Sequence, residues 1–167
     1  KHASTVSGLS PQEWEVVYGQ SLEHRVAPLI FERLKQAGLH EAIPRRIREE
    51  FHRVYLTTLS RNLRLYNRLS KLLQRFNDEN IPVIVLKGAH LAEKVYGDVG
   101  LRTFEDMDLM FLEKDLPRCG EIVFECAGRK DPCRLNVDIH WKIDFSTADL
   151  PIRTESLWDS AMRTTIW

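Results

Sequence analysis

Two aspartates separated by one residue, Asp106 and Asp108, stand at the start of a short apolar run. Side chains alternate between the two faces of a β-strand, so a strand here would place both carboxylates on one face and Met107 and Leu109 on the other. Adjacent carboxylates raise each other's pKa unless a cation neutralises them. Because magnesium and manganese prefer oxygen ligands, the pair predicts a site for Mg²⁺ or Mn²⁺.

A third carboxylate, Asp138, lies on the polar side of a later segment in which apolar and polar residues alternate. If the two strands are neighbours, Asp138 joins Asp106 and Asp108 around two cations about 3.5–4 Å apart, an arrangement that activates an attacking oxygen and stabilises a leaving phosphate. Asp144 is the chief rival of Asp138 for this third place.

An Asp-x-Asp pair alone is a weak signal, and several enzyme classes use one. In haloacid-dehalogenase-like phosphatases the apolar run precedes the first aspartate, whereas here it follows Asp106. Restriction-type nucleases require a Glu-x-Lys or Asp-x-Lys, which this sequence does not contain, and nucleotide-sugar glycosyltransferases generally require a longer chain. The sequence also has neither a P-loop nor a dinucleotide-binding fingerprint.

The elements that must position these carboxylates lie in the second half of the chain. Apolar runs and alternation predict strands over residues 81–86, 106–112 and 134–143. Helical periodicity predicts helices over 89–95 and 116–127. The expected fold class is α/β (α+β), a small mixed sheet with flanking helices that is preceded by a helical segment. We expect residues 1–79 to form that segment and 80–167 to form the core.

The first half of the chain reads as helical. Ser10 and Glu13 form a capping box around Pro11, which predicts a helix from there to about Tyr18. A second helix is expected over residues 22–37, with Pro28 kinking or splitting it and Gly38 as its C-cap. A long apolar stripe predicts a third helix over 44–77.

The other face of this long helix is rich in arginine and lysine. Such a face could bind a polyanion such as RNA, but it is more often only solvated, and no nucleic-acid motif accompanies it. The basic residues are Arg45, Arg46, Arg48, Arg53, Arg61, Arg64, Arg68, Lys71 and Arg75.

Composition places the chain among ordinary globular proteins. Of 167 residues, 43% are hydrophobic and 29% charged, and 24 basic residues balance 24 acidic ones, so no global field attracts nucleic acid or membrane. We expect a cytoplasmic protein without a membrane span. Cys119 and Cys126 are expected to be core residues on one helix face, rather than metal ligands together with Cys133.

Several short motifs, read together, resemble a known family. They are Leu86-Lys87-Gly88-Ala89, Tyr96-Gly97-Asp98, Leu101-Arg102, Asp106-x-Asp108-Leu109 and Asp138-Ile139-His140-Trp141. This block resembles the nucleotidyltransferases of the DNA polymerase beta superfamily, and within it the bacterial and archaeal family usually labelled uncharacterised nucleotidyltransferase. The resemblance covers residues from about 20 to 145, and as a compound motif it is fairly specific.

The resemblance implies a reaction and roles for the three carboxylates. A nucleotidyl group would pass from a nucleoside triphosphate such as ATP to an unknown acceptor, with release of pyrophosphate, at a two-metal site for Mg²⁺ or Mn²⁺. Asp106 and Asp108 would hold the metals that bridge the triphosphate. Asp138 would complete the second metal site and accept the proton of the acceptor hydroxyl.

The resemblance also implies a phosphate-binding group. Gly88 would open the backbone beside the nucleotide phosphates, and Lys87 and Arg102 would be the nearby cations. The chain departs from the superfamily at Ala89, where a serine is common, and in the short stretch between Asp108 and Asp138. A segment near 128–134 and the helices that usually follow the core are expected to be missing.

Two other functions stay open. The runner-up is a non-catalytic, antitoxin-like or partner-binding protein that retains the fold and acts through its helical half. Retention of all three carboxylates favours the enzyme over this alternative. Nucleic-acid binding through the basic helix is the third and weakest. The sequence does not identify the acceptor, the nucleotide base or the oligomeric state.

Overall fold

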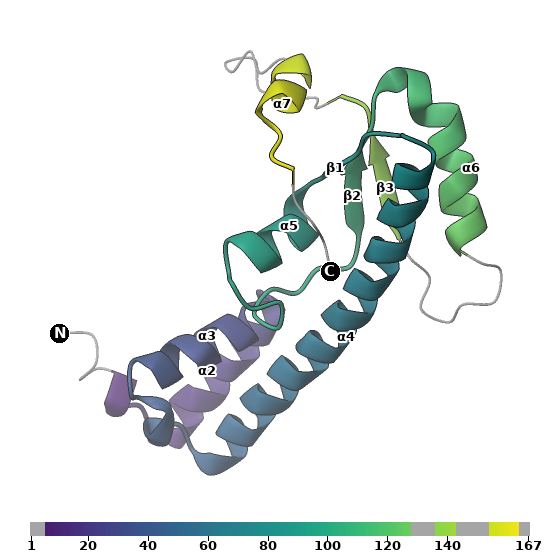
Figure 1. Ribbon diagram of the computed structural model, residues 1–167. Helices are drawn as coiled ribbons and strands as arrows, with labels where there is room; N and C mark the ends of the chain where they lie inside the picture. Colours follow the sequence, from purple (N-terminus) through teal and green to yellow (C-terminus); the bar gives the residue numbers. More distant parts are fainter. Residues whose placement is uncertain (1–5, 128–135, 143–153, 164–167) are drawn as a thin grey trace. The chain divides into compact units, whose positions relative to one another are not determined.

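The computed structural model describes residues 6–127, 136–142 and 154–163 of the chain (Figure 1). It has the expected mixed α/β fold, in which helices accompany one small mixed sheet. The chain forms two compact units, Lys1–Leu63 with Leu91–Phe104 and Arg64–His90 with Glu105–Trp167, which we describe separately. The expected boundary at residue 79 stays a prediction.

Helix α2 (Pro11–Glu23) belongs to the first unit, and its start confirms the capping box. The Ser10 backbone N–H donates to Glu13 Oε2 at 2.7 Å, and the Glu13 N–H donates to Ser10 Oγ at 3.3 Å. Each residue thereby satisfies a polar group that the helix end would leave unpaired. The helix is longer than expected and continues to Glu23 rather than Tyr18.

The helix expected over 22–37 is interrupted near its start. Helix α3 comprises only Ala27–Gln36, because Arg25 has a left-handed backbone with φ 56° and ends the preceding helix. Pro28 therefore lies in the first turn of α3, where its fixed φ suits a helix and its missing N–H costs nothing. Gly38, with φ +69°, follows the helix as expected.

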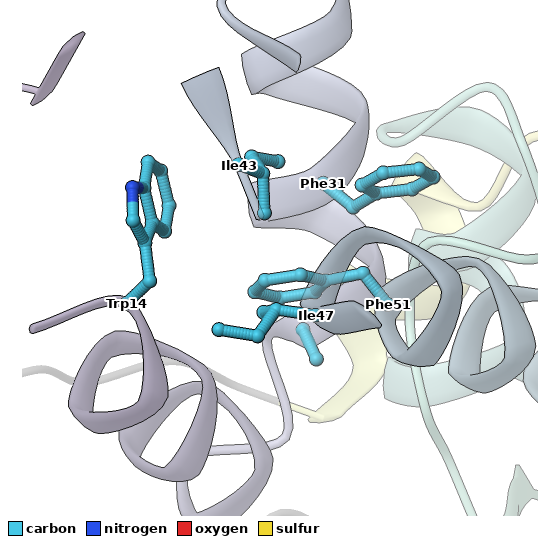
Figure 2. Packing of buried hydrophobic residues seen from close by; sticks show 6 residues of the cluster. Trp14, Phe31, Ile43, Ile47 and Phe51 are labelled. Carbon is cyan, nitrogen blue, oxygen red and sulfur yellow. The ribbon is translucent and has the colours of Figure 1, made fainter. Parts of the chain in front are cut away.

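The core of the first unit lies between α2, α3, the short 3₁₀ helix η1 (His40–Ala42) and the start of α4 (Arg45–Asp78). Figure 2 shows the aromatic side chains at its centre, where the Phe31 and Phe51 rings stack with centroids 5.8 Å apart. Burial of this apolar surface is the main stabilising contribution to the unit. The buried members are Trp14, Ala27, Phe31, Ile43, Ile47 and Phe51.

Helix α4 spans 34 residues and confirms the long helix expected over 44–77. Much of its apolar surface is buried, since Phe51, Leu69, Leu72 and Phe76 are fully buried, whereas Leu63 of the predicted stripe is exposed. The helix contributes residues to both units, since the division between them falls after Leu63.

Basic residues of α4 form several ion pairs. Arg45 pairs with Glu49 at 2.9 Å, and Arg75 pairs with Glu125 at 3.0 Å. Arg53 and Arg48 pair with Glu50 and Glu41, and Arg61, Arg64 and Arg68 also take part in interactions. A face whose charges are engaged in this way is less available to a polyanion.

We expect the full chain to bind RNA weakly and with a steep salt dependence. Any affinity that rests on the basic face of α4 should fall by at least about tenfold as salt rises from about 50 to 200 mM, since each phosphate contact releases counterions. Fluorescence anisotropy with a labelled single-stranded RNA measures this. Binding that persists at 200 mM would favour the nucleic-acid hypothesis.

The motif Tyr96-Gly97-Asp98 shapes a loop within the first unit. Asp98 accepts a hydrogen bond from the Tyr55 hydroxyl at 2.9 Å and one from the Gly100 N–H at 2.7 Å. Burial and this contact raise the pKa of Tyr55 to about 12. A Cβ at Gly100 would lie 2.6 Å from the Tyr55 ring, so only glycine fits there without movement of that ring. The residues around Asp98 and Gly100 therefore maintain the structure of this loop.

The second unit contains the sheet, with strand order β1-β2-β3 (Figure 1). Strand β1 (Ile84–Val85) is antiparallel to β2 (Met107–Met110), which is parallel to β3 (Val137–His140). All three are shorter than the segments expected over 81–86, 106–112 and 134–143, although residues 134–135 and 143 lie outside the described part. The other elements are η2 (Glu113–Asp115), α6 (Leu116–Ala127), α7 (Thr154–Ser160) and the first half of α5 (Lys87–Lys94), which belongs to this unit as far as His90.

The core of this unit forms around β2, whose four residues are all buried. Phe111 follows the strand and packs edge-on against Phe76 of α4, with ring centroids 4.8 Å apart. Cys119 of α6 is buried as expected, but Cys126 is exposed, which corrects the expectation that both belong to the core. Cys126 lies one residue from the end of the helix. Cys133 lies outside the described residues.

None of the helices in the described part of the chain combines the length and apolar character that a membrane span requires.

Candidate active site

The structure places Asp108 on the central strand of the sheet. Strand β2 has a neighbour on each side, and the Asp108 side chain is only 3% exposed. A buried carboxylate is costly unless it is paired or hydrogen-bonded, so its partners define the chemistry of this position.

Strand register brings Asp138 beside Asp108. The parallel strands β2 and β3 pair Asp108 directly with Asp138. Directly paired residues on neighbouring strands project from the same face of a sheet. Asp138 itself is exposed, whereas Asp108 is buried.

Lys87 pairs with the buried carboxylate of Asp108. Its Nζ donates to Asp108 Oδ1 at 2.6 Å, although the Lys87 side chain itself is 63% exposed. Lys87 lies two residues after the end of β1 and has φ 46°, a left-handed backbone that is unusual for a residue with a side chain. Such conformations gather at functional sites, so this one marks the position as worth testing.

His140 is the second partner of Asp108. Its Nε2 lies 2.9 Å from the same Oδ1 atom that Lys87 contacts. An ionised carboxylate can only accept hydrogen bonds, so Nε2 carries the proton and donates it. His140 is not among the site residues that the sequence predicts, although its two-residue spacing from Asp138 places both on one face of β3.

The electrostatics of the site reflect these contacts. Burial by itself would raise the pKa of the Asp108 carboxyl, but the hydrogen bonds from Lys87 and His140 outweigh it, so this pKa lies below its usual value. The hydrogen bond to Asp108 is the main reason that the pKa of Lys87 is raised. The negative charges of Asp106 and Asp138 raise it further, so all three carboxylates act on this one ammonium.

Three further residues were predicted for the site, namely Asp106, Gly88 and Arg102, and they lie in different parts of the structure. Asp106 is half-buried and precedes β2, which begins one residue later than expected. Gly88 is buried in the first turn of α5. Arg102 belongs to the first unit, where its guanidinium lies over the Tyr96 ring at 5.7 Å. Its role in phosphate binding stays a prediction.

One observation speaks against a metal ion at these residues and one speaks for it. Within residues 6–127, 136–142 and 154–163, no three His, Cys, Asp or Glu side chains are gathered in a group that could hold an ion. The donor chemistry nevertheless suits a hard divalent cation, because the three charges that act on Lys87 are carboxylates. Asp108 Oδ1 is engaged by Lys87 and His140. Asp144, the rival third carboxylate, lies outside the described residues.

Fold and site together define an α+β protein with aspartates projecting from a small mixed sheet. The family described as uncharacterised nucleotidyltransferase matches residues 10–166, and because this is nearly the whole sequence, the chain belongs to that family. The resemblance drawn from the sequence motifs is thereby confirmed, and the family places the chain among the transferases. Neither the search of curated proteins nor the search of solved structures found a match.

Proposed function

We propose that the protein transfers a nucleotidyl group from a nucleoside triphosphate to an acceptor in a divalent-cation-dependent reaction that releases pyrophosphate. The observation that carries this proposal is the register of β2 and β3, which pairs Asp108 with Asp138. The negative charges of Asp106, Asp108 and Asp138, which all raise the pKa of Lys87, support it. Membership of a nucleotidyltransferase family supports the reaction class.

In this proposal Asp106, Asp108 and Asp138 hold the cations. A bound Mg²⁺ or Mn²⁺ would polarise the phosphate oxygens and neutralise the charge that develops on them. The chain's own residues then position the reactants, and such positioning accounts for much of the rate enhancement in phosphoryl chemistry.

Asp138 is the proposed base. An acceptor hydroxyl attacks the α-phosphorus of the triphosphate, a new phosphorus–oxygen bond forms, and the bond to the bridging oxygen of pyrophosphate breaks. The hydroxyl proton passes to the Asp138 carboxylate. Asp138 suits this role better than Asp108, because it is exposed whereas Asp108 is buried beneath two hydrogen-bond donors.

The phosphates are proposed to lie at the start of α5. Backbone N–H groups in the first turn of a helix bind anions, because they have no partner within the helix. Gly88 is buried there without a side chain that could block the approach of a phosphate. Lys87 begins the same helix and supplies a positive charge.

Incubation of the full chain with each radiolabelled nucleoside triphosphate and Mg²⁺, followed by mass analysis of candidate acceptors, tests the proposal. We expect one triphosphate to yield pyrophosphate and an acceptor whose mass rises by one nucleotidyl group. If no triphosphate is consumed with either Mg²⁺ or Mn²⁺, the non-catalytic, partner-binding function becomes the better explanation of the fold.

His140 should matter through its hydrogen bond to Asp108. We expect His140→Ala to lower turnover and Mn²⁺ affinity by about 10- to 100-fold, the usual effect of losing a residue that orients a metal ligand. His140→Gln keeps an N–H donor and should recover part of both. Steady-state kinetics and calorimetric titration with Mn²⁺ measure this. Equal losses of turnover and Mn²⁺ affinity in the two variants would show that the His140 ring contributes packing and does not orient Asp108.

A further inference from the structure

One oxygen atom of the proposed cation site is occupied by the protein itself. Asp108 Oδ1 accepts hydrogen bonds from both Lys87 Nζ and His140 Nε2. A carboxylate oxygen with two such donors is not free to bind a cation. A divalent ion can use this oxygen only if at least one of the two donors moves away.

The two donors differ in their freedom to move. The Lys87 side chain is 63% exposed, and a lysine ammonium is a compact charge on a flexible stem, so it can leave without repacking of its surroundings. His140 is 30% exposed and is anchored on β3, whose register with β2 fixes its position. Lys87 is therefore the donor that exchanges.

Charge favours the same exchange. The carboxylates of Asp106, Asp108 and Asp138 carry three negative charges, against which Lys87 supplies one positive charge. A divalent cation in the place of the ammonium would neutralise one charge more. The ammonium, once released, would lie beside the start of α5, where the proposed function places the triphosphate.

We propose that Lys87 is an exchangeable counter-ion of the carboxylate site: its ammonium holds Asp108 until a divalent cation displaces it, and it then pairs with a phosphate of the nucleotide. Lys87 is thus a positioning residue for the empty site and a phosphate ligand in the loaded one. The second role rests on the proposed function, whereas the first depends only on the binding of a cation to Asp108.

The first test is calorimetric titration of the full chain with Mn²⁺ alone. Lys87→Met keeps the length of the side chain but removes the competing charge, so its Kd for Mn²⁺ should be roughly three- to tenfold lower than that of the wild type. Lys114→Met is the matched control, because Lys114 is exposed in the same unit and is not among the charges that shift the pKa of Asp108. An unchanged or higher Kd in Lys87→Met overturns the exchange.

The second test compares melting temperatures with and without the cation. In EDTA, Lys87→Met leaves the buried Asp108 with one partner fewer, and its Tm should be about 2–4 °C below that of the wild type. In saturating Mn²⁺ the difference should disappear, because the ammonium is displaced in the wild type as well. A difference of the same size in both buffers would mean that the contact is only structural, which overturns the proposal.

The third test uses Mn²⁺ with inorganic triphosphate, which carries the phosphates without a base. Lys87→Met should bind the triphosphate at least about threefold more weakly while binding Mn²⁺ more tightly, and Lys87→Arg should bind the triphosphate nearly as the wild type does. Opposite changes for the two ligands are a result that a general loss of structure does not produce. Unchanged triphosphate affinity in Lys87→Met overturns the phosphate role.

The outcomes also separate this inference from the proposed function. A wild-type chain that binds no Mn²⁺ at millimolar concentration, or an Asp108→Asn variant that binds it normally, overturns both. Mn²⁺ binding that does not tighten in Lys87→Met overturns the exchange alone. Failure of every nucleoside triphosphate to react removes the proposed function but leaves the Mn²⁺ measurements as support for the exchange.

Discussion

Asp108→Asn should abolish nucleotidyl transfer, by at least about 100- to 1000-fold, while the protein stays folded. The substitution removes the negative charge that a cation requires but keeps an oxygen that can accept hydrogen bonds from Lys87 and His140. Turnover of the reactive triphosphate, measured beside a circular-dichroism spectrum and a melting curve, gives the result. Wild-type turnover in this variant would show that the site has been assigned to the wrong residues.

The stability of the same variant distinguishes Asp108 from Asp106. From sequence alone, removing either carboxylate relieves repulsion, so both asparagine variants should melt higher in metal-free buffer. The structure changes this expectation for Asp108, because its charge strengthens two hydrogen bonds in a buried place. We therefore expect Asp108→Asn to melt lower than the wild type in EDTA and Asp106→Asn to melt at or above it.

The sequence was most informative where a local signal fixes a boundary. The capping box at Ser10 and the apolar stripe that begins after Pro44 each predicted a helix start correctly, because caps and periodicity act within a few residues. The break at Arg25 was not predicted, because arginine as a residue type does not indicate a left-handed backbone. Strand lengths were overestimated because an apolar run does not reveal how many of its residues find a partner strand.

The sequence predicts carboxylates for the candidate site, but it does not predict their hydrogen-bond partners. Alternation along a strand predicts that Asp106 and Asp108 share a face, although β2 begins only at Met107. Only the pairing of two strands shows that Asp138 lies beside Asp108. The contact between Lys87 and Asp108 joins residues from different elements, 21 positions apart. A lysine at the end of a strand looks the same in sequence whether it binds a phosphate or a carboxylate.

Asp138→Ala should lower kcat by about 100- to 10,000-fold and change the KM for the nucleotide far less. Asp138 is proposed to take the proton of the acceptor hydroxyl, an event of the transition state, so its loss affects the chemical step more than substrate binding. Its register with Asp108 supports this role, and its exposure leaves the carboxylate accessible to an acceptor.

Asp144→Ala, measured in parallel, is the control that decides between the two rival aspartates. It removes the same group from a nearby position of the chain and should leave both kcat and KM close to those of the wild type. The reverse result, a large loss in Asp144→Ala and a small one in Asp138→Ala, would move the third carboxylate to Asp144. Small losses in both would leave Asp106 and Asp108 as a cation-binding pair without a base, and the non-catalytic function would then explain the fold better than the enzyme does.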